Sequence, residues 1–170
     1  MTNQYEQGAV LITSLIFLLV LTLMATTSIK ITILEETMSA NIKDKNLAFQ
    51  AAESALRSGE TWMESRLSVP ENDNDRLYSL DSYDALDRNW WWPDNENDDV
   101  NNEGIAVSMQ LVNKDPRYAI EEHSFIKDSL RVGHEPPSGQ YVHRVTAYGI
   151  GGTDNALSIL QSTYTKRYNE

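Results

Sequence analysis

Acid–base or metal chemistry in this chain would depend mainly on three histidines, because the sequence contains no cysteine. His123 and His143 lie in stretches with the alternation of a strand, and His134 lies in a loop-like stretch. Ser124 follows His123 directly, but neighbours on a strand point to opposite faces, so the two do not form a catalytic pair. The sequence also lacks the HExxH, GxSxG, Walker-type and GxGxxG motifs. We therefore interpret the histidines as structural and expect no enzyme.

Carboxylates are dense between residues 68 and 104, and they offer a second kind of chemistry. Calcium takes about six to eight oxygen ligands, which alternating acidic residues on a loop can supply. The EF-hand template does not fit, because no glycine stands at its sixth position and no glutamate at its twelfth. We expect a solvated acidic loop and no cofactor, with a calcium site as the alternative hypothesis. Its candidate ligands are Asp94, Glu96, Asp98, Asp99 and Glu103.

Three adjacent tryptophans, Trp90, Trp91 and Trp92, precede Pro93 in the same acidic stretch. Alternate side chains of an extended chain point to opposite faces, so the three rings cannot all face one way. We expect one or two of them to fill the core of the domain. The alternative is an exposed aromatic contact for a partner protein or a glycan.

The composition of the whole chain limits the classes of protein to which these residues can belong. At 170 residues, the chain is long enough for one compact domain plus one appendage. Its net charge of −11 repels a phosphate backbone, which argues against direct binding of nucleic acid. The lack of cysteine excludes thiol catalysis, thiolate metal sites and disulfides.

An uncharged, apolar segment begins close to the amino terminus. From Ala9 to Ile29 the sequence runs for 21 residues without a charge, enough to cross about 30 Å of hydrocarbon as a helix. The alternatives are a helix buried in a soluble core and a cleaved secretory signal. Residues 1–8 contain one glutamate and no basic residue, and the apolar run is longer than that of a secretory signal. We therefore expect a retained transmembrane helix.

A helical pattern continues beyond the apolar segment as one apolar stripe among charged residues. No proline occurs before Pro70, so we predict a single helix from about Ala9 to Leu67. The alternative is a membrane anchor followed by a coiled-coil stalk, but small residues such as Ala51 and Ala55 suit close packing on a sheet. The stripe consists of Ile31, Leu34, Met38, Ile42, Phe49, Ala52, Leu56 and Met63.

The carboxy-terminal part has the two-residue periodicity of strands, and turn signals separate its four strand-like stretches. The turn at residues 151–155 joins the last two stretches and predicts a hairpin. A short helix is predicted at residues 77–86, inside the acidic loop. We expect an α+β fold in which the long helix packs on an antiparallel sheet of about four strands. The predicted strands are 105–112, 118–126, 141–150 and 156–166.

Several stretches of the sequence resemble one protein family. A short polar leader that ends at Gly8, followed by an apolar helix, is similar to the start of type IV pilin precursors. Residues 34–41 (LEETMSAN) and 46–60 (NLAFQAAESALRSGE) resemble the amino-terminal region of the PilX minor pilins. Residues 144–149 (RVTAYG) and 160–164 (LQSTY) resemble the end of that family.

The resemblance implies a type IV pilin fold and a minor subunit that primes assembly of the type IV pilus. It implies that a prepilin peptidase cuts between Gly8 and Ala9 and that the new amine of Ala9 is methylated. Most pilins carry Glu at the fifth mature residue, which is Thr13 here, and the lack of Glu also resembles PilX members and the tip pseudopilin of type II secretion. A carboxylate in hydrocarbon is costly without a partner, so Thr13 avoids that cost but offers no anion to a neighbouring subunit.

The same resemblance implies a location and a set of partners. The chain is expected to cross the inner membrane once and then to enter the extracellular fibre, in a tip complex that supports twitching motility, adhesion or DNA uptake. The implied partners are the prepilin peptidase, the inner-membrane assembly platform, other minor pilins, the major pilin and a tip adhesin. The alternatives are the tip pseudopilin of a type II secretion system and a single-pass, membrane-anchored periplasmic sensor or adhesion module. The corresponding segments are the leader (1–8), the transmembrane and fibre-core helix (9–29), the amphipathic helix (30–67), the acidic tryptophan loop (68–104) and the sheet part of the head (105–170).

Overall fold

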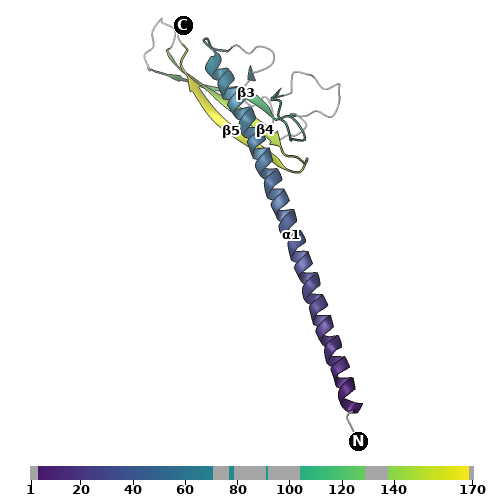
Figure 1. Ribbon diagram of the computed structural model, residues 1–170. Coiled ribbons are helices and arrows are strands. Elements are labelled where there is room, and N and C mark those ends of the chain that lie inside the picture. The colour runs from purple at the N-terminus through teal and green to yellow at the C-terminus, as the bar shows by residue number, and fades with distance from the viewer. Residues whose placement is uncertain (1–3, 71–76, 79–90, 92–103, 129–137, 169–170) are drawn as a thin grey trace. The chain divides into compact units, whose positions relative to one another are not determined.

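One long helix and a five-stranded sheet make up the described part of the chain (Figure 1). By its internal contacts, the chain divides into two compact units, residues 1–42 and residues 43–170. The computed structural model describes residues 4–70, 77–78, 91, 104–128 and 138–168.

The first unit is the amino-terminal part of α1, a helix that runs from Gln4 to Ser65. The single unbroken helix confirms the prediction, although it begins earlier and ends slightly before the expected Leu67. Hydroxyl side chains within it donate to carbonyls about one turn earlier, as Thr22 Oγ1 does to the carbonyl of Leu19 at 2.8 Å. Such bonds satisfy polar groups that would be costly to leave unpaired in hydrocarbon.

The second unit contains the sheet, whose strand order is β1-β3-β4-β5, with β2 also paired to β3. Its three long strands are β3 (Arg117–Lys127), β4 (Gly139–Ile150) and β5 (Leu157–Lys166), and neighbours among them are antiparallel. These strands confirm the last three sequence predictions. The predicted hairpin is also present, since Ile150 at the end of β4 lies opposite Leu157 at the start of β5.

The strand predicted at residues 105–112 is wrong for most of its length, because β2 contains only Ile105–Ala106. After it the chain turns: the N–H of Val107 donates to the carbonyl of Pro116 at 2.8 Å, and Leu111 takes a left-handed φ of 71°. The alternating pattern of this stretch therefore belongs to a compact loop.

The short helix predicted at residues 77–86 is also wrong where the structure describes it. Leu77–Tyr78 form β1, which pairs parallel with β3, so the sheet has five strands and is not wholly antiparallel. Leu77 is buried, and its side chain packs in the core beside β3. Burial on the sheet thus outweighs the helical spacing of the leucines. The remainder of the predicted helix lies outside the described residues.

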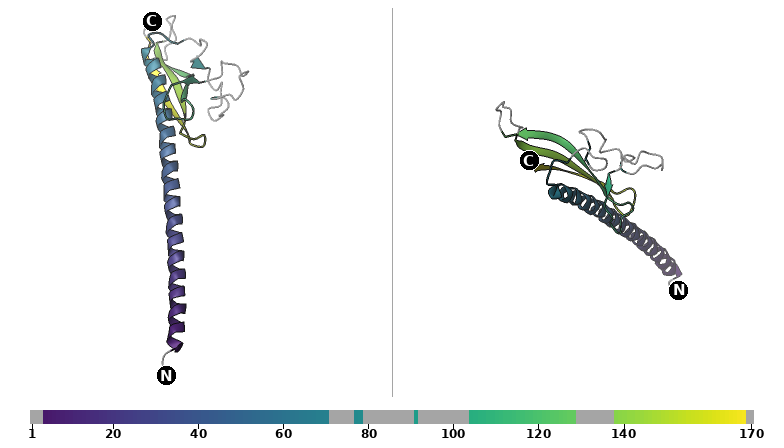
Figure 2. Two further views of the ribbon diagram at one scale, coloured as in Figure 1. Left: turned by 45° about the vertical axis from the view of Figure 1, so that its right-hand side comes forward. Right: turned by 90° about the horizontal axis from the view of Figure 1, so that it is seen from above.

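Residues 43–65 of α1 lie along one face of the sheet, as both views in Figure 2 show. A Cβ added at Gly149 of β4 would lie 2.5 Å from the carbonyl oxygen of Ala48 and 3.0 Å from Cα of Ala52. The backbones of α1 and β4 therefore meet with no side chain between them. The predicted packing of small residues on a sheet is confirmed, and the coiled-coil stalk is wrong for this segment. The fully buried alanines are Ala48, Ala51, Ala52 and Ala55.

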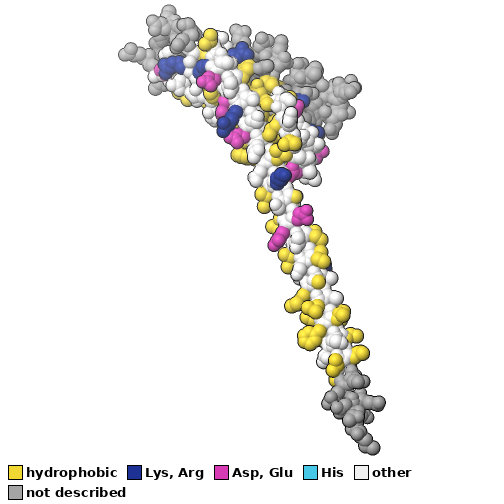
Figure 3. Space-filling view, viewed as in Figure 1, with side chains coloured by type: hydrophobic (Ala, Val, Ile, Leu, Met, Phe, Trp, Pro, Cys, Tyr) yellow, Lys and Arg dark blue, Asp and Glu magenta, His cyan; other side chains and the backbone are white. Residues whose placement is uncertain are grey.

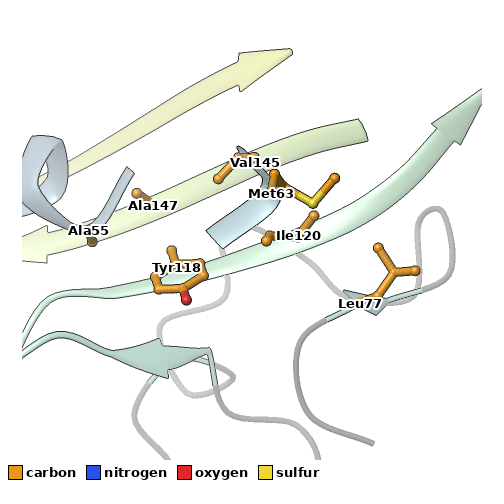
Figure 4. Packing of buried hydrophobic residues seen from close by; sticks show 7 residues of the cluster. All are labelled: Ala55, Met63, Leu77, Tyr118, Ile120, Val145 and Ala147. Atoms are coloured by element: carbon orange, nitrogen blue, oxygen red, sulfur yellow. The ribbon is translucent and has the colours of Figure 1, made fainter. Parts of the chain in front are cut away.

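Apolar side chains are buried on both faces of the sheet. On the face opposite α1, Trp91 is fully buried, and its ring lies 5.5 Å from that of Tyr148. This position confirms that one of the three tryptophans fills the core, while Trp90 and Trp92 lie outside the described residues. A second cluster of buried residues lies between α1 and the sheet, as Figure 4 shows. It consists of Ala55, Met63, Leu77, Tyr118, Ile120, Val145 and Ala147.

Candidate functional site

The first unit presents a long apolar surface. Large hydrophobic side chains from Val10 to Ile42 are exposed, from 43% for Val20 to 71% for Phe17, and Figure 3 shows many of them along the helix. A contiguous exposed surface of this kind marks contact with a membrane or with partner proteins. One described helix, α1, is long and apolar enough to cross a membrane.

The predicted apolar stripe divides into two parts with different surroundings. Its later members Ala52 and Met63 are buried in the second unit, whereas Phe49 is 48% exposed. The earlier members of the stripe are exposed too. Charged residues such as Glu35 and Glu36 lie between them along the helix. An exposed stripe at helical spacing fits the apolar face of another helix. These earlier members are Ile31, Leu34, Met38 and Ile42.

The residues that the family resemblance assigns to processing, Gly8 and Ala9, both lie within α1. Thr13 follows one turn later, and its Oγ1 donates to the carbonyls of Ala9 at 3.1 Å and Val10 at 2.9 Å. The hydroxyl proton of Thr13 is therefore used within the helix, and the side chain carries no charge.

The structure describes two of the three histidines. His123 is exposed on β3, at a register shift between Glu122 and Ser124. His143 of β4 is fully buried, and neither of its ring nitrogens has a hydrogen-bond partner in the described part of the chain. Burial lowers the pKa of His143, because the imidazolium would lose its hydration. A neutral ring in the core fits a structural role, and His134 lies outside the described residues.

The calcium hypothesis stays a prediction. Among the residues that the structure describes, no group of three His, Asp or Glu side chains could hold a metal ion. The candidate ligands lie outside those residues: Asp94, Glu96, Asp98, Asp99 and Glu103.

A buried ion pair lies on the sheet face opposite α1. Arg144 Nε donates to Glu121 Oε2 at 2.6 Å, and Glu121 is only 1% exposed. Antiparallel pairing places the two residues directly opposite each other on β3 and β4, so the pair favours one register of these strands. Two positions further along β4, the buried Thr146 accepts a hydrogen bond from Gln161 Nε2 at 3.0 Å. These contacts hold the three long strands together.

Asp44 of α1 holds the turn between β4 and β5. Its Oδ1 accepts hydrogen bonds from the N–H of Gly152 at 2.5 Å and of Thr153 at 3.3 Å, and its Oδ2 accepts one from the hydroxyl of Thr153. The hydroxyl of Thr153 is the main cause of a lowered pKa of Asp44; partial desolvation opposes the shift, and the two N–H groups support it. The adjacent Lys45 donates from Nζ to the carbonyl of Leu157 at 2.5 Å.

Lys166, at the end of β5, caps the carboxyl end of α1. The last turn of this helix contains no basic residue, although its final carbonyls have no partners within the helix. Lys166 Nζ donates to the carbonyls of Met63 at 3.2 Å, Glu64 at 2.7 Å and Arg66 at 2.6 Å. The last strand thus supplies the positive charge that the helix end favours.

Sequence patterns do not predict these polar contacts, because their partners lie far apart along the chain. Lys45 and Leu157, for example, are separated by 112 positions. One signal was present: the turn at residues 151–155 has backbone N–H groups that need an acceptor, and Asp44 lies on the predicted helix.

Two family models match the chain. The model of the PilX N-terminal region matches residues 7–57, and that of the type IV pilus assembly protein PilX C-term matches residues 44–166. The second match alone covers more than half of the chain, and the two overlap within α1. No curated protein and no solved structure gives a significant match.

Proposed function

The chain belongs to the PilX family of type IV pilus assembly proteins, and from this premise we propose that it is a minor pilin that primes fibre assembly and is incorporated near the tip. Members of this family are structural components of the pilus. Its match therefore favours this function over the tip pseudopilin of a type II secretion system and over a membrane-anchored periplasmic sensor or adhesion module.

The observation that carries the proposal is the exposed apolar surface of α1 between Val10 and Ile42. Burying one large aliphatic or aromatic side chain stabilises its bound state by about 1.5–3 kcal/mol, so this surface requires a nonpolar environment. Hydrocarbon supplies that environment before assembly, and the helices of neighbouring subunits supply it in the fibre. The hydroxyls bonded within the helix are compatible with both environments.

Thr13 supports a position at the end of the fibre. A carboxylate at this depth would be costly in hydrocarbon unless the terminal amine of a neighbouring subunit satisfied it. Thr13 has no charge, and its hydroxyl donates within its own helix. We infer that this subunit does not dock beneath another subunit through such a pair, which fits a capping position.

The proposal includes the processing and the partners that the family resemblance implies. A prepilin peptidase cuts between Gly8 and Ala9, and the amine of Ala9 is methylated. Before assembly, the subunit lies in the inner membrane, where it contacts the assembly platform. It then enters the extracellular fibre. Its partners there are other minor pilins, the major pilin and a tip adhesin.

Mass spectrometry of the amino terminus tests the proposal. The protein is recovered separately from membranes and from sheared surface fibres. A peptide that begins at methylated Ala9 is expected in both fractions. An intact Met1 terminus confined to membranes would instead identify a membrane-anchored domain and contradict the fibre function.

A second experiment tests the capping position. Thr13→Glu introduces a carboxylate at the fifth mature residue, and Thr13→Ser is the matched control that keeps a hydroxyl. Thr13→Glu is expected to change the number of fibres or the subunit composition of their tips, whereas Thr13→Ser leaves both unchanged. If Thr13→Glu has no effect on either quantity, the capping inference loses its support.

A further inference from the structure

The outer edge of β5 is a row of backbone groups without strand partners among the described residues. In the sheet of Figure 1, β5 is the last strand in the order and pairs only with β4. Its ten residues pair along their whole length, from Leu157 opposite Ile150 to Lys166 opposite Tyr141. One side of its backbone is therefore used in the sheet, and the other side pairs with no strand that the structure describes.

The hairpin identifies which residues face outward. The N–H of Gly151 donates to the carbonyl of Ala156 at 2.8 Å, which makes these two residues a hydrogen-bonded pair. Hydrogen-bonded and non-hydrogen-bonded pairs alternate along an antiparallel ladder. The backbone of Ser162 consequently faces β4, whereas those of Gln161 and Thr163 face outward. The carbonyl of Leu157 also faces outward by this rule, and it accepts its hydrogen bond from a side chain of α1.

This edge lacks the features by which proteins prevent unwanted strand pairing. Long edge strands usually carry charges, prolines or bulges. From Leu157 to Thr165 the strand has no charge and no proline, and no register shift interrupts its pairing with β4. On the other side of β4, β3 has such features in the part that pairs with neither β1 nor β2. Its pairing with β4 has a register shift after Glu122, and this part carries two charged residues, Glu122 and Lys127.

The side chains and charges at the edge also suit an added strand. Gln161, Thr163 and Thr165 are exposed, and β-branched residues such as threonine pack well against cross-strand neighbours. Lys45 and Lys166 lie at the two ends of the edge, but both already donate to backbone carbonyls of this chain. Between them, Glu60 Oε1 of α1 accepts a hydrogen bond from the hydroxyl of Ser162 at 2.7 Å, so the helix side of the edge carries negative charge. This charge favours an occupant without acidic side chains.

We propose that the outer edge of β5 accepts an extended segment of another pilus component, without acidic side chains, as an additional strand. The open donors and acceptors define the occupant as an extended backbone. Its identity as a pilus component rests on the proposed function.

Replacing Thr163 by proline tests pairing at the edge of β5 without disrupting the fold. The N–H of Thr163 faces outward, so Thr163→Pro removes a donor that the ladder to β4 does not use, and proline is tolerated at such edge positions. Thr163→Ala is the matched control, because it removes the same hydroxyl and keeps the N–H. Ser162→Pro removes an N–H that faces β4. The full-length protein is expected to melt at the same temperature with either Thr163 change and at a lower temperature with Ser162→Pro.

Site-specific cross-linking tests the occupant. The photoreactive residue benzoylphenylalanine replaces Thr165 in the full chain, in piliated cells, and cross-linked peptides are identified by mass spectrometry. Cross-links are expected on adjacent residues of one extended segment of another pilus component, with about a tenfold loss when Thr163→Pro is added and no loss with Thr163→Ala. Cross-links only to a second copy, none to any protein, or a yield unaffected by Thr163→Pro would each overturn the proposal.

Failure of this inference is distinguishable from failure of the proposed function. Deleting the gene tests the function, because an unchanged number of surface fibres would contradict a priming role. If deletion abolishes fibres while the chain with benzoylphenylalanine in place of Thr165, and Thr163 intact, restores them but forms no such cross-links, the strand proposal alone fails.

Discussion

Replacing Gly149 by alanine tests the close packing of α1 on β4. The added Cβ would lie 2.5 Å from the carbonyl oxygen of Ala48 and 3.0 Å from Cα of Ala52. Both are backbone atoms of a helix, so they cannot swing aside as the end of a flexible side chain can. Either the segment of α1 around these alanines moves away from the sheet, or β4 bends.

The size of the effect follows from this geometry. Restoring an ordinary contact needs a movement of roughly 1 Å, and a gap of that size forfeits about a quarter to a half of the attraction between packed atoms. Overpacking in a core typically costs about 1–3 kcal/mol, and the immobile neighbours here place the expected cost near 3 kcal/mol. For a cooperative unit of this size, the melting temperature should fall by about 10 °C.

Circular dichroism of the full-length protein in detergent, followed against temperature, measures this change. Gly152→Ala is the matched control, because its added Cβ would meet nothing nearer than Asp44 Oδ1 at 3.4 Å. No described glycine has a positive φ, so the two substitutions differ in the space available and not in backbone strain. Equal melting temperatures for Gly149→Ala and Gly152→Ala would refute the argument that backbone contact limits this interface.

Two other substitutions test the buried histidine and the helix cap. Burial lowers the pKa of His143 below its ordinary value of 6.5, so the unfolded chain takes up a proton first, and stability declines as the pH falls below that value. His143→Leu should flatten this decline in urea midpoints measured from about pH 7.5 to 5, and an unchanged slope would contradict the assignment. Lys166→Met removes the donor to the last carbonyls of α1 and should reduce the free energy of unfolding by about 1–2 kcal/mol in urea titrations, with a smaller loss for Lys166→Arg. A Lys166→Met chain as stable as the original would show that water replaces this cap.

The long helix and the three long strands are predictable from the sequence because their patterns are local. An uninterrupted apolar run, the absence of proline before Pro70 and small residues such as Ala52 are sufficient to predict α1 and its packing. The glycine-rich turn marks the hairpin for the same reason. The packing of Trp91 in the core follows from the size of its ring, although the residue is helical and the prediction assumed an extended chain.

The errors arise where tertiary contacts outweigh local patterns. Leu77 has helical spacing with later leucines, but pairing with β3 and burial in the core make it a strand. The stretch after Ala106 alternates like a strand, yet it has no continuous partner and turns at Leu111. The cap at Lys166 depends on a helix end about a hundred positions earlier, which no sequence window contains. The processing site remains a prediction that rests on family resemblance.

The position of the helix cap has a consequence for the order of events during synthesis. The ribosome produces the apolar segment before Lys166, so α1 must remain without its cap, and β4 without one of its neighbouring strands, until β5 has emerged. A chain that stops before Leu157 would retain the membrane segment, lose half of the hairpin and leave β4 as a bare edge. The last strand therefore makes completion of the head dependent on translation through β5, long after insertion has begun.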